Sequence, residues 1–131
     1  MLKFHRIGSA IHSMLFPQGH FKKKGKFMRM LLKANYPGHQ AKILIQAFTS
    51  SDVPPRPESV KELGSMGYSD GEGFHAVFIF DVPDDQIQAT LMAQERRNIF
   101  FASRVEGFTA ETHMGLSIAE GIPIVMEVLP K

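Results

Sequence analysis

The stretch that decides the fold runs from residue 73 to residue 114. It begins with Gly-Phe-His-Ala-Val-Phe-Ile-Phe-Asp (73–81), continues as Val-Pro-Asp-Asp-Gln-Ile-Gln-Ala-Thr-Leu-Met-Ala-Gln-Glu-Arg-Arg (82–97), and reaches Val-Glu-Gly-Phe-Thr-Ala-Glu-Thr-His-Met (105–114). The first and third runs alternate side chains between two faces, as strands do, whereas the second spaces its apolar residues for one face of a helix. We therefore predict a strand, a helix and a strand in this order, with Asp84 as the N-cap of the helix.

The strand at 73–81 is predicted to be central and covered on both faces. Its two faces are both largely apolar, with Phe74, Ala76, Phe78 and Phe80 on one side and His75, Val77 and Ile79 on the other. A strand that faces water on one side would show a polar face instead. Helices should cover one face, and a partner or a ligand should cover the other.

The segments before this stretch complete the order of elements. Residues 27–36 alternate like a strand, and 39–49 have helical spacing. Three prolines stiffen the loop at 50–57 before a strand at 58–68, where two glycines suggest a bulge, and a glycine-rich turn at 69–73 suggests a hairpin. The order strand, helix, strand, strand, helix, strand predicts an α+β, ferredoxin-like βαββαβ antiparallel sheet with helices on one face.

The segment at 117–129 has two interpretations. Ser117 and Glu120 form the pattern of a capping box, and the spacing of the apolar residues suits a helix, which we prefer despite Gly121 and Pro123. Alternation from 122 to 129 keeps a strand as the alternative.

Length and composition limit the class of protein. The 131 residues are 44% hydrophobic and 21% charged, which is typical of one soluble globular domain. The absence of cysteine removes thiol nucleophiles, thiolate metal sites and disulfides, and it fits a reducing compartment, so we expect a cytoplasmic protein without a transmembrane segment. P-loop and serine-hydrolase motifs are missing, and Gly71-x-Gly73 lacks the rest of a dinucleotide-binding loop.

Charge divides the chain into a basic extension at 1–27 and a domain at 28–131. Residues 1–29 hold seven basic residues and no acidic ones, so the rest of the chain holds eight basic against thirteen acidic residues, a formal charge of −5. Three interpretations of the extension stay open: a targeting or membrane-surface segment, a disordered tail for an acidic partner or nucleic acid, and a start-site artefact with the natural start at Met28 or Met30. Nucleic acid is not expected as a partner of the domain, because the basic balance of the whole chain comes from its N-terminal residues and the rest of the chain carries a net negative charge.

Three runs resemble a known superfamily. The run Arg-Pro-Glu-Ser-Val (56–60) and the strands at 73–82 and 105–114 resemble small bacterial and archaeal members, of unknown function, of the dimeric α/β-barrel superfamily over about residues 28–129. The resemblance implies a homodimer whose two sheets face each other around a cavity. Relatives such as antibiotic-biosynthesis monooxygenases and chlorite-dismutase-like proteins do chemistry in or near that space, but none of their motifs matches positions in this chain.

The candidate polar site lies on the face of the sheet opposite the helices. Glu111 and His113 stand two apart on one strand, so the carboxylate could orient the imidazole as a general acid or base. If the register brings His75 to them, the three could hold a metal instead. The alternative is a polar dimer interface or the rim of a cavity. Further candidates for ligand contacts are Arg29, Lys33 and Tyr68.

Two functions follow from these features. The first is a non-catalytic homodimeric module that binds a small ligand or a protein partner. The second is a small enzyme, monooxygenase-like or metal-dependent, that uses His113 with Glu111. No motif names a cofactor, and the sequence by itself does not decide whether the protein is an enzyme.

Overall fold

The computed structural model describes residues 26–130 of the chain. The expectations for the basic extension concern residues 1–27, nearly all of which lie outside the described range.

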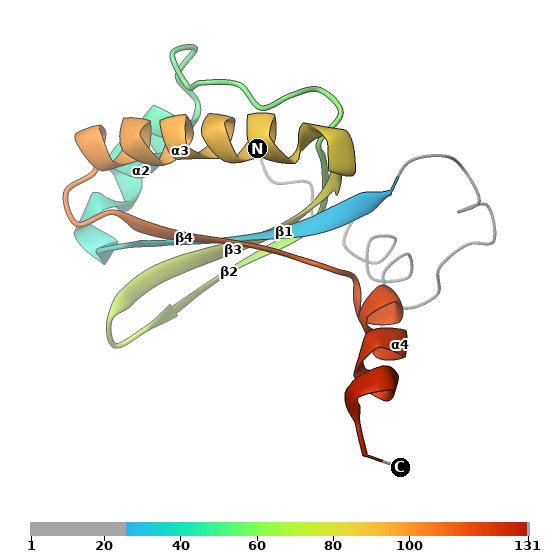
Figure 1. Cartoon of the computed structure of the whole chain (residues 1–131). Helices are drawn as coiled ribbons and strands as arrows, with labels where there is room; N and C mark the ends of the chain where they lie inside the picture. The colour runs from blue at the N-terminus through green and yellow to red at the C-terminus, as the bar shows by residue number, and fades with distance from the viewer. Residues whose placement is uncertain (1–25, 131) are drawn as a thin grey trace.

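The described chain forms an α+β structure with one open, four-stranded antiparallel sheet and three α-helices (Figure 1). The strands lie in the order β2-β3-β1-β4, and every neighbouring pair is antiparallel. The elements in chain order are β1 (Phe27–Tyr36), a 3₁₀ turn (Gly38–Gln40), α2 (Ala41–Phe48), β2 (Lys61–Asp70), β3 (Gly73–Pro83), a 3₁₀ turn (Asp84–Gln86), α3 (Ile87–Arg104), β4 (Thr109–Gly115) and α4 (Ile118–Val128).

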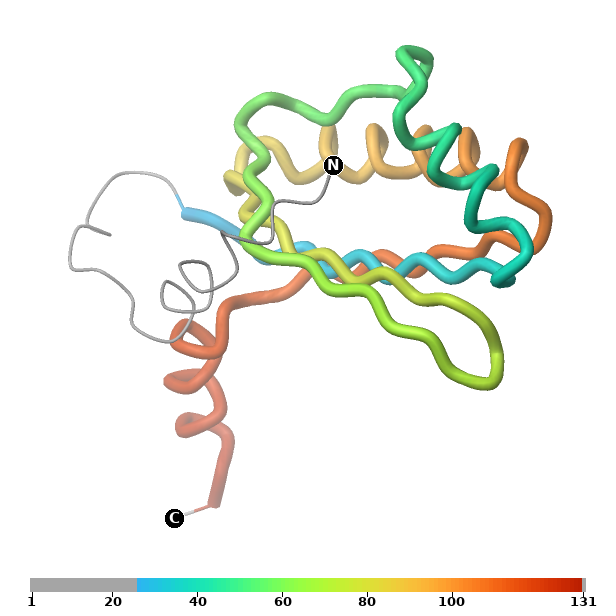
Figure 2. Tube along the Cα trace, turned by 180° about the vertical axis from the view of Figure 1, so that it is seen from behind, coloured from blue at the N-terminus to red at the C-terminus, as the bar shows by residue number. Residues whose placement is uncertain are grey.

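Helices α2 and α3 cover one face of the sheet, and α4 leaves the end of β4 on the other side (Figures 1 and 2). Alternation along β1 and β3 supplies the covered face with buried apolar side chains, including Met30, Leu32, Phe80 and Val82. A second buried cluster joins Ala47 of α2 to the α3 aromatics Phe100 and Phe101. The expected central strand at 73–81 is therefore confirmed, since β3 lies between β1 and β2.

The start of α3 differs from the sequence prediction. Asp84 does not cap the helix: it lies in a 3₁₀ turn, where its backbone N–H donates to the carbonyl of Lys26 at 2.8 Å. The α-helix begins at Ile87, and its N-cap, Gln86, makes no side-chain capping bond. This bond to Lys26, the residue before β1, holds the backbone at Asp84, and the α-helix begins three residues later.

The last strand begins at Thr109, not at Val105 as predicted. Helix α3 continues to Arg104, and Val105 is a buried C-cap residue whose N–H donates to the carbonyl of Phe101 at 2.8 Å. Gly107 follows with φ of 80°, a conformation that ordinary residues avoid, and it makes the turn into β4. Residues 105–108 therefore cap the helix and make the turn, although their alternation had suggested a strand.

The C-terminal segment is a helix, as preferred from its capping box. The hydroxyl of Ser117 donates to Glu120 Oε1 at 2.8 Å and accepts from the backbone N–H of Glu120 at 3.2 Å. No residue of α4 is buried. The bulge expected in β2 is also confirmed, because the pairing with β3 shifts between Glu62 and Gly64.

Candidate functional site

The residues singled out from the sequence lie on the open face of the sheet, opposite α2 and α3. Pairing places Tyr68 opposite His75, Lys33 opposite Glu111, and His113 opposite Leu31. A shared face does not make a shared site, however, because the strand order and the register separate these side chains.

His75 is held in a cluster of its own near the β2–β3 hairpin. Its ring Nδ1 lies 2.5 Å from Asn35 Oδ1, and its Nε2 lies 2.9 Å from Asp70 Oδ1. The ring of Tyr68 stacks on the imidazole with centroids 4.7 Å apart, and His75 is only 8% exposed. The bond to His75 and a second bond from the Glu72 N–H hold the pKa of Asp70 below its ordinary value of 3.8. Both ring nitrogens are thus engaged, and the cluster fastens β2 and β3 to β1.

Glu111 and His113 form an exposed pair. The distance from His113 Nε2 to Glu111 Oε2 is 3.6 Å, and the two side chains are 64% and 61% exposed. His75 does not lie beside this pair, because β1 separates β3 from β4, and His75 pairs with Asn35 whereas His113 pairs with Leu31. Within residues 26–130, no three His, Cys, Asp or Glu side chains gather closely enough to hold a metal ion.

The remaining candidates on this face serve local contacts. The Arg29 guanidinium donates to the Asp81 carboxylate, and burial raises the pKa of Asp81 although the charge of Arg29 opposes that rise. Lys33 lies between its cross-strand neighbours Val77 and Glu111. An open groove of about 270 Å³ runs beside Arg29 toward the start of α4, and its other lining residues include Leu31, Ile79, His113, Leu116 and Ile118.

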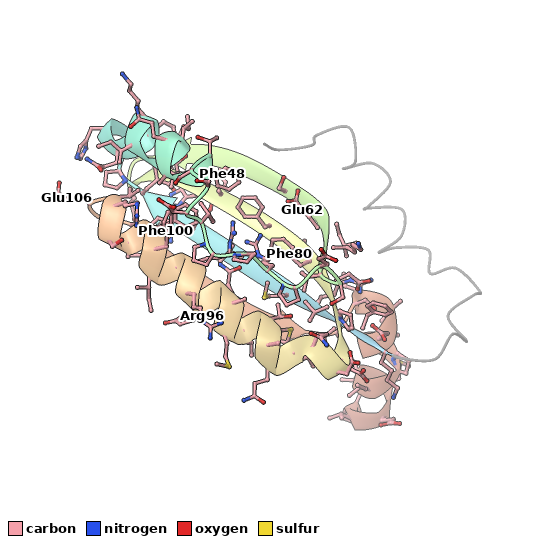
Figure 3. The ribbon with its side chains drawn as sticks, turned by 90° about the horizontal axis from the view of Figure 1, so that it is seen from above. Phe48, Glu62, Phe80, Arg96, Phe100 and Glu106 are labelled. Carbon is pink, nitrogen blue, oxygen red and sulfur yellow. The ribbon has the colours of Figure 1, made fainter. Side chains whose placement is uncertain are left out.

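A better formed cavity lies on the other side of the sheet, beneath α3. It has a volume of about 90 Å³ and opens to solvent. Its apolar lining comes from β1, β3, α2, α3 and the turn before β4, and it consists of Leu32, Ala34, Leu44, Phe48, Ala76, Phe78, Phe101 and Phe108. Figure 3 views this layer from above, with Phe48, Phe80, Phe100 and Glu62 labelled.

Polar side chains line part of the same cavity. They are Arg56, Glu62, Gln94, Arg97 and Asn98. Gln94 accepts from Arg56 Nε at 2.9 Å and donates to Asn98 Oδ1 at 2.8 Å, while Arg97 donates to the carbonyl of Pro54 at 2.8 Å. These bonds join the middle of α3 to the proline-rich loop that precedes β2.

This cavity was not predicted from the sequence. Gln94 and Arg97 stand three residues apart on α3, on the same face as Ala93 and Phe101, and all four are buried. That spacing is a visible signal, but Arg97 is the last residue of the run at 82–97 that the sequence predicts as a helix, and arginine near a helix end is usually solvated. No local sequence pattern marks Arg56 as a cavity residue, because its position depends on the path of the loop past α3.

Comparison with known proteins adds little. No protein-family profile and no curated protein match the sequence. Among solved structures, a DUF3240 family protein from Shewanella baltica OS155 is 12% identical, with a TM-score of 0.29 over 66% of this chain and 87% of that one. A similarity this low supports no functional argument. Among the described helices, none is long and apolar enough to cross a membrane.

Proposed function

We propose that this chain is a non-catalytic binding module that holds a small organic molecule in the cavity between α3 and the sheet. The observation that carries the proposal is the cavity itself, which is preformed, walled by apolar and aromatic side chains, and lined in part by a few convergent polar groups. This combination is typical of ligand sites. Its volume of about 90 Å³ is below the ~150 Å³ that accommodates benzene in an engineered protein core, so the ligand is small or extends through the opening.

The enzyme alternative has weaker support. The Glu111–His113 pair is mostly exposed, and the cavity that could exclude water lies on the other face of the sheet. General acid or base chemistry gains from a site that holds the substrate against the reacting group. The open groove includes His113 but not Glu111.

A homodimer with the ferredoxin-like, dimeric α/β-barrel arrangement is part of the same proposal. Eight apolar side chains on and beside α4 support it, each 43–76% exposed: Leu116, Ile118, Ile122, Ile124, Val125, Met126, Val128 and Leu129. Monomers seldom leave a large contiguous apolar patch uncovered, and each partner of a standard interface buries ~800 Å².

The open sheet face suits a second copy of this chain. Three basic residues (Arg29, Lys33 and Lys61) and three acidic ones (Asp70, Asp81 and Glu111) occupy its strands. A two-fold interface uses the same patch on both subunits and therefore needs such a balance of charges. Sedimentation velocity of the full chain should give the mass of two copies.

Filling the cavity tests the binding proposal. A panel of small neutral, cationic and anionic organic molecules is titrated into the full chain and followed by NMR. At least one class should cause saturable shifts in cavity residues such as Phe78 and Phe101. The variant Ala76→Leu places a larger side chain in the lining and should abolish these shifts.

The matched control is Ala89→Leu, the same change at an exposed position of α3, and it should bind as the parent does. If no molecule shifts the NMR signals of the cavity residues, or if the Ala76→Leu variant binds the same molecules as the parent does, the cavity is not a ligand site.

A further inference from the structure

Two guanidinium groups meet at the polar part of the cavity beneath α3. Arg56 reaches it from the proline-rich loop and lies over the Phe80 ring, 4.3 Å from the centroid. Arg97 reaches it from α3 and is only 9% exposed. Arginine is almost never buried in this way unless a negative group accompanies it.

The protein itself supplies less negative charge than these arginines require. Glu62 is the one acidic residue in the lining, and among the ion pairs of residues 26–130 none joins it to Arg56 or Arg97. The hydrogen-bond partners of the two guanidiniums are the neutral side-chain oxygen of Gln94 and the neutral carbonyl of Pro54. One positive charge at the cavity is therefore left without a matching negative charge.

A donor is also left without a partner. The Nε atom of Arg97 is buried and makes no hydrogen bond within the described part of the chain. A buried unpaired donor costs free energy, and one in a preformed cavity calls for an explanation. A bound oxygen atom would satisfy it.

The electrostatic balance points the same way. Burial, together with the smaller effect of the Arg97 charge, lowers the pKa of Arg56 to about 10, although Glu62 opposes both effects. Burial also lowers the pKa of Arg97. The two cations therefore destabilise each other, and an anion between them would relieve both the repulsion and the loss of hydration.

We infer that the ligand of this cavity is a small organic oxyanion, with a carboxylate or phosphate group held by Arg56 and Arg97 and a short apolar body against Phe78 and Phe101. The inference rests on the proposed binding function and adds the chemical class of the ligand. Guanidinium suits this role because its fixed fork of N–H donors matches the oxygens of such groups.

Three probes of nearly equal shape test the inference. Butyrate, its neutral amide butyramide, and butylamine are titrated into the full chain with NMR detection of the Arg97 Nε–H signal. Butyrate should shift this signal saturably and bind at least about tenfold more tightly than butyramide, the ratio expected for hydrogen bonds to a charged group. Butylamine should not bind.

Substitutions assign the effect to named residues. With binding followed by the NMR signals of Phe78 and Phe101, Arg56→Gln and Arg97→Gln should each weaken butyrate binding about tenfold or more, whereas Glu62→Gln should strengthen it by removing a repelling charge. Arg96→Gln is the matched control, because it removes the same charge from the exposed neighbour of Arg97 and should leave the affinity unchanged. Glu62→Gln keeps both arginines, so the test does not depend on whether the arginine variants fold.

The outcomes separate the two proposals. Equal binding of butyrate and butyramide, or a Glu62→Gln variant that binds butyrate no better, overturns the oxyanion inference while the binding function stands. If inorganic phosphate binds as tightly as butyrate, the part of the inference that gives the ligand an apolar body is wrong. If no probe and no member of the wider panel binds, the binding function itself is wrong.

Discussion

At the scale of single residues, histidine shows how the same residue type serves two different roles on one sheet. His75 has both ring nitrogens bonded and is buried under Tyr68, whereas His113 stands exposed beside Glu111. From the sequence, the two were candidates for one polar site. Their actual surroundings make His75 a structural link between strands and leave His113 at the edge of an open groove.

The bond between Asp70 and His75 predicts a pH-dependent contribution to stability. The pKa of Asp70 is lower in the folded protein than its ordinary value of 3.8, so the folded state favours the ionised carboxylate. This contribution is present above pH 3.8 and is lost as the pH falls through the lower folded pKa. Asp70→Asn should therefore lower the melting temperature near neutral pH. The difference in melting temperature between this variant and the parent should shrink below pH 3.8.

Thermal melts from pH 7 to pH 3 measure this effect. Asp52→Asn is the control, because the Asp52 carboxylate is exposed and makes no hydrogen bond within the described residues. A difference between Asp70→Asn and the parent that stays constant over this pH range would contradict the assignment.

At the scale of elements, the β2–β3 hairpin depends on a close backbone approach. Gly73 has φ of 125°, and a Cβ atom added there would lie 2.7 Å from the carbonyl oxygen of Tyr36 in β1. Both the backbone conformation and the contact exclude a side chain. The glycine-rich turn therefore does more than reverse the chain, since it lets β3 pair along the whole of β1.

Gly73→Ala should lower the free energy of unfolding by more than about 1 kcal/mol, because the substitution adds strain and a clash in the folded state. Chemical denaturation measures the change. Gly71→Ala is a control in the same turn: a Cβ there would meet nothing within 4 Å, so the change should stay within about 0.5 kcal/mol. Equal effects of the two substitutions would show that Gly73 is not constrained.

At the scale of the whole molecule, the two sides of the sheet differ in how they are covered. Helices α2 and α3 close one side (Figure 1), while apolar side chains on the open face and on α4 remain exposed. A helix that is apolar on most of its surface is normally buried. No residue of α4 is buried in the single chain, so the proposed dimer assigns a second copy as its cover.

Ile122→Asp on α4 should weaken self-association at least about tenfold, because a carboxylate would be buried in the dimer interface. Ile122 is 53% exposed, so the single chain should still fold. Ile99→Asp, at a 61% exposed position of α3, is the matched control and should leave association unchanged. Sedimentation velocity over a range of concentrations compares them.

A parent chain that sediments as one copy, or an Ile122→Asp variant that associates like the parent, would exclude α4 from a homodimer interface. Loss of association only on removal of residues 1–25 would instead assign the contact to that segment.

The local order of strands and helices followed from the sequence, because alternation, helical spacing, glycine turns and the Ser117–Glu120 capping box are short-range properties. These signals predicted β1, β3 and the bulge in β2 correctly, and they favoured α4 over a strand. They also placed His75, Glu111 and His113 on the open face. They failed at the ends of α3, where the backbone bond of Asp84 to Lys26 and the burial of Val105 override local preference.

Only the tertiary structure decided which polar residues meet. The strand order places β1 between His75 and His113, so these residues do not form the three-residue site that a different register would have allowed. The same packing carries Arg56 from the proline-rich loop over the sheet to Arg97 of α3, 41 positions later in the chain, and encloses both beside a cavity. Periodicity predicts the face on which a side chain lies, but the distance between residues on different elements depends on strand order, register and loop path.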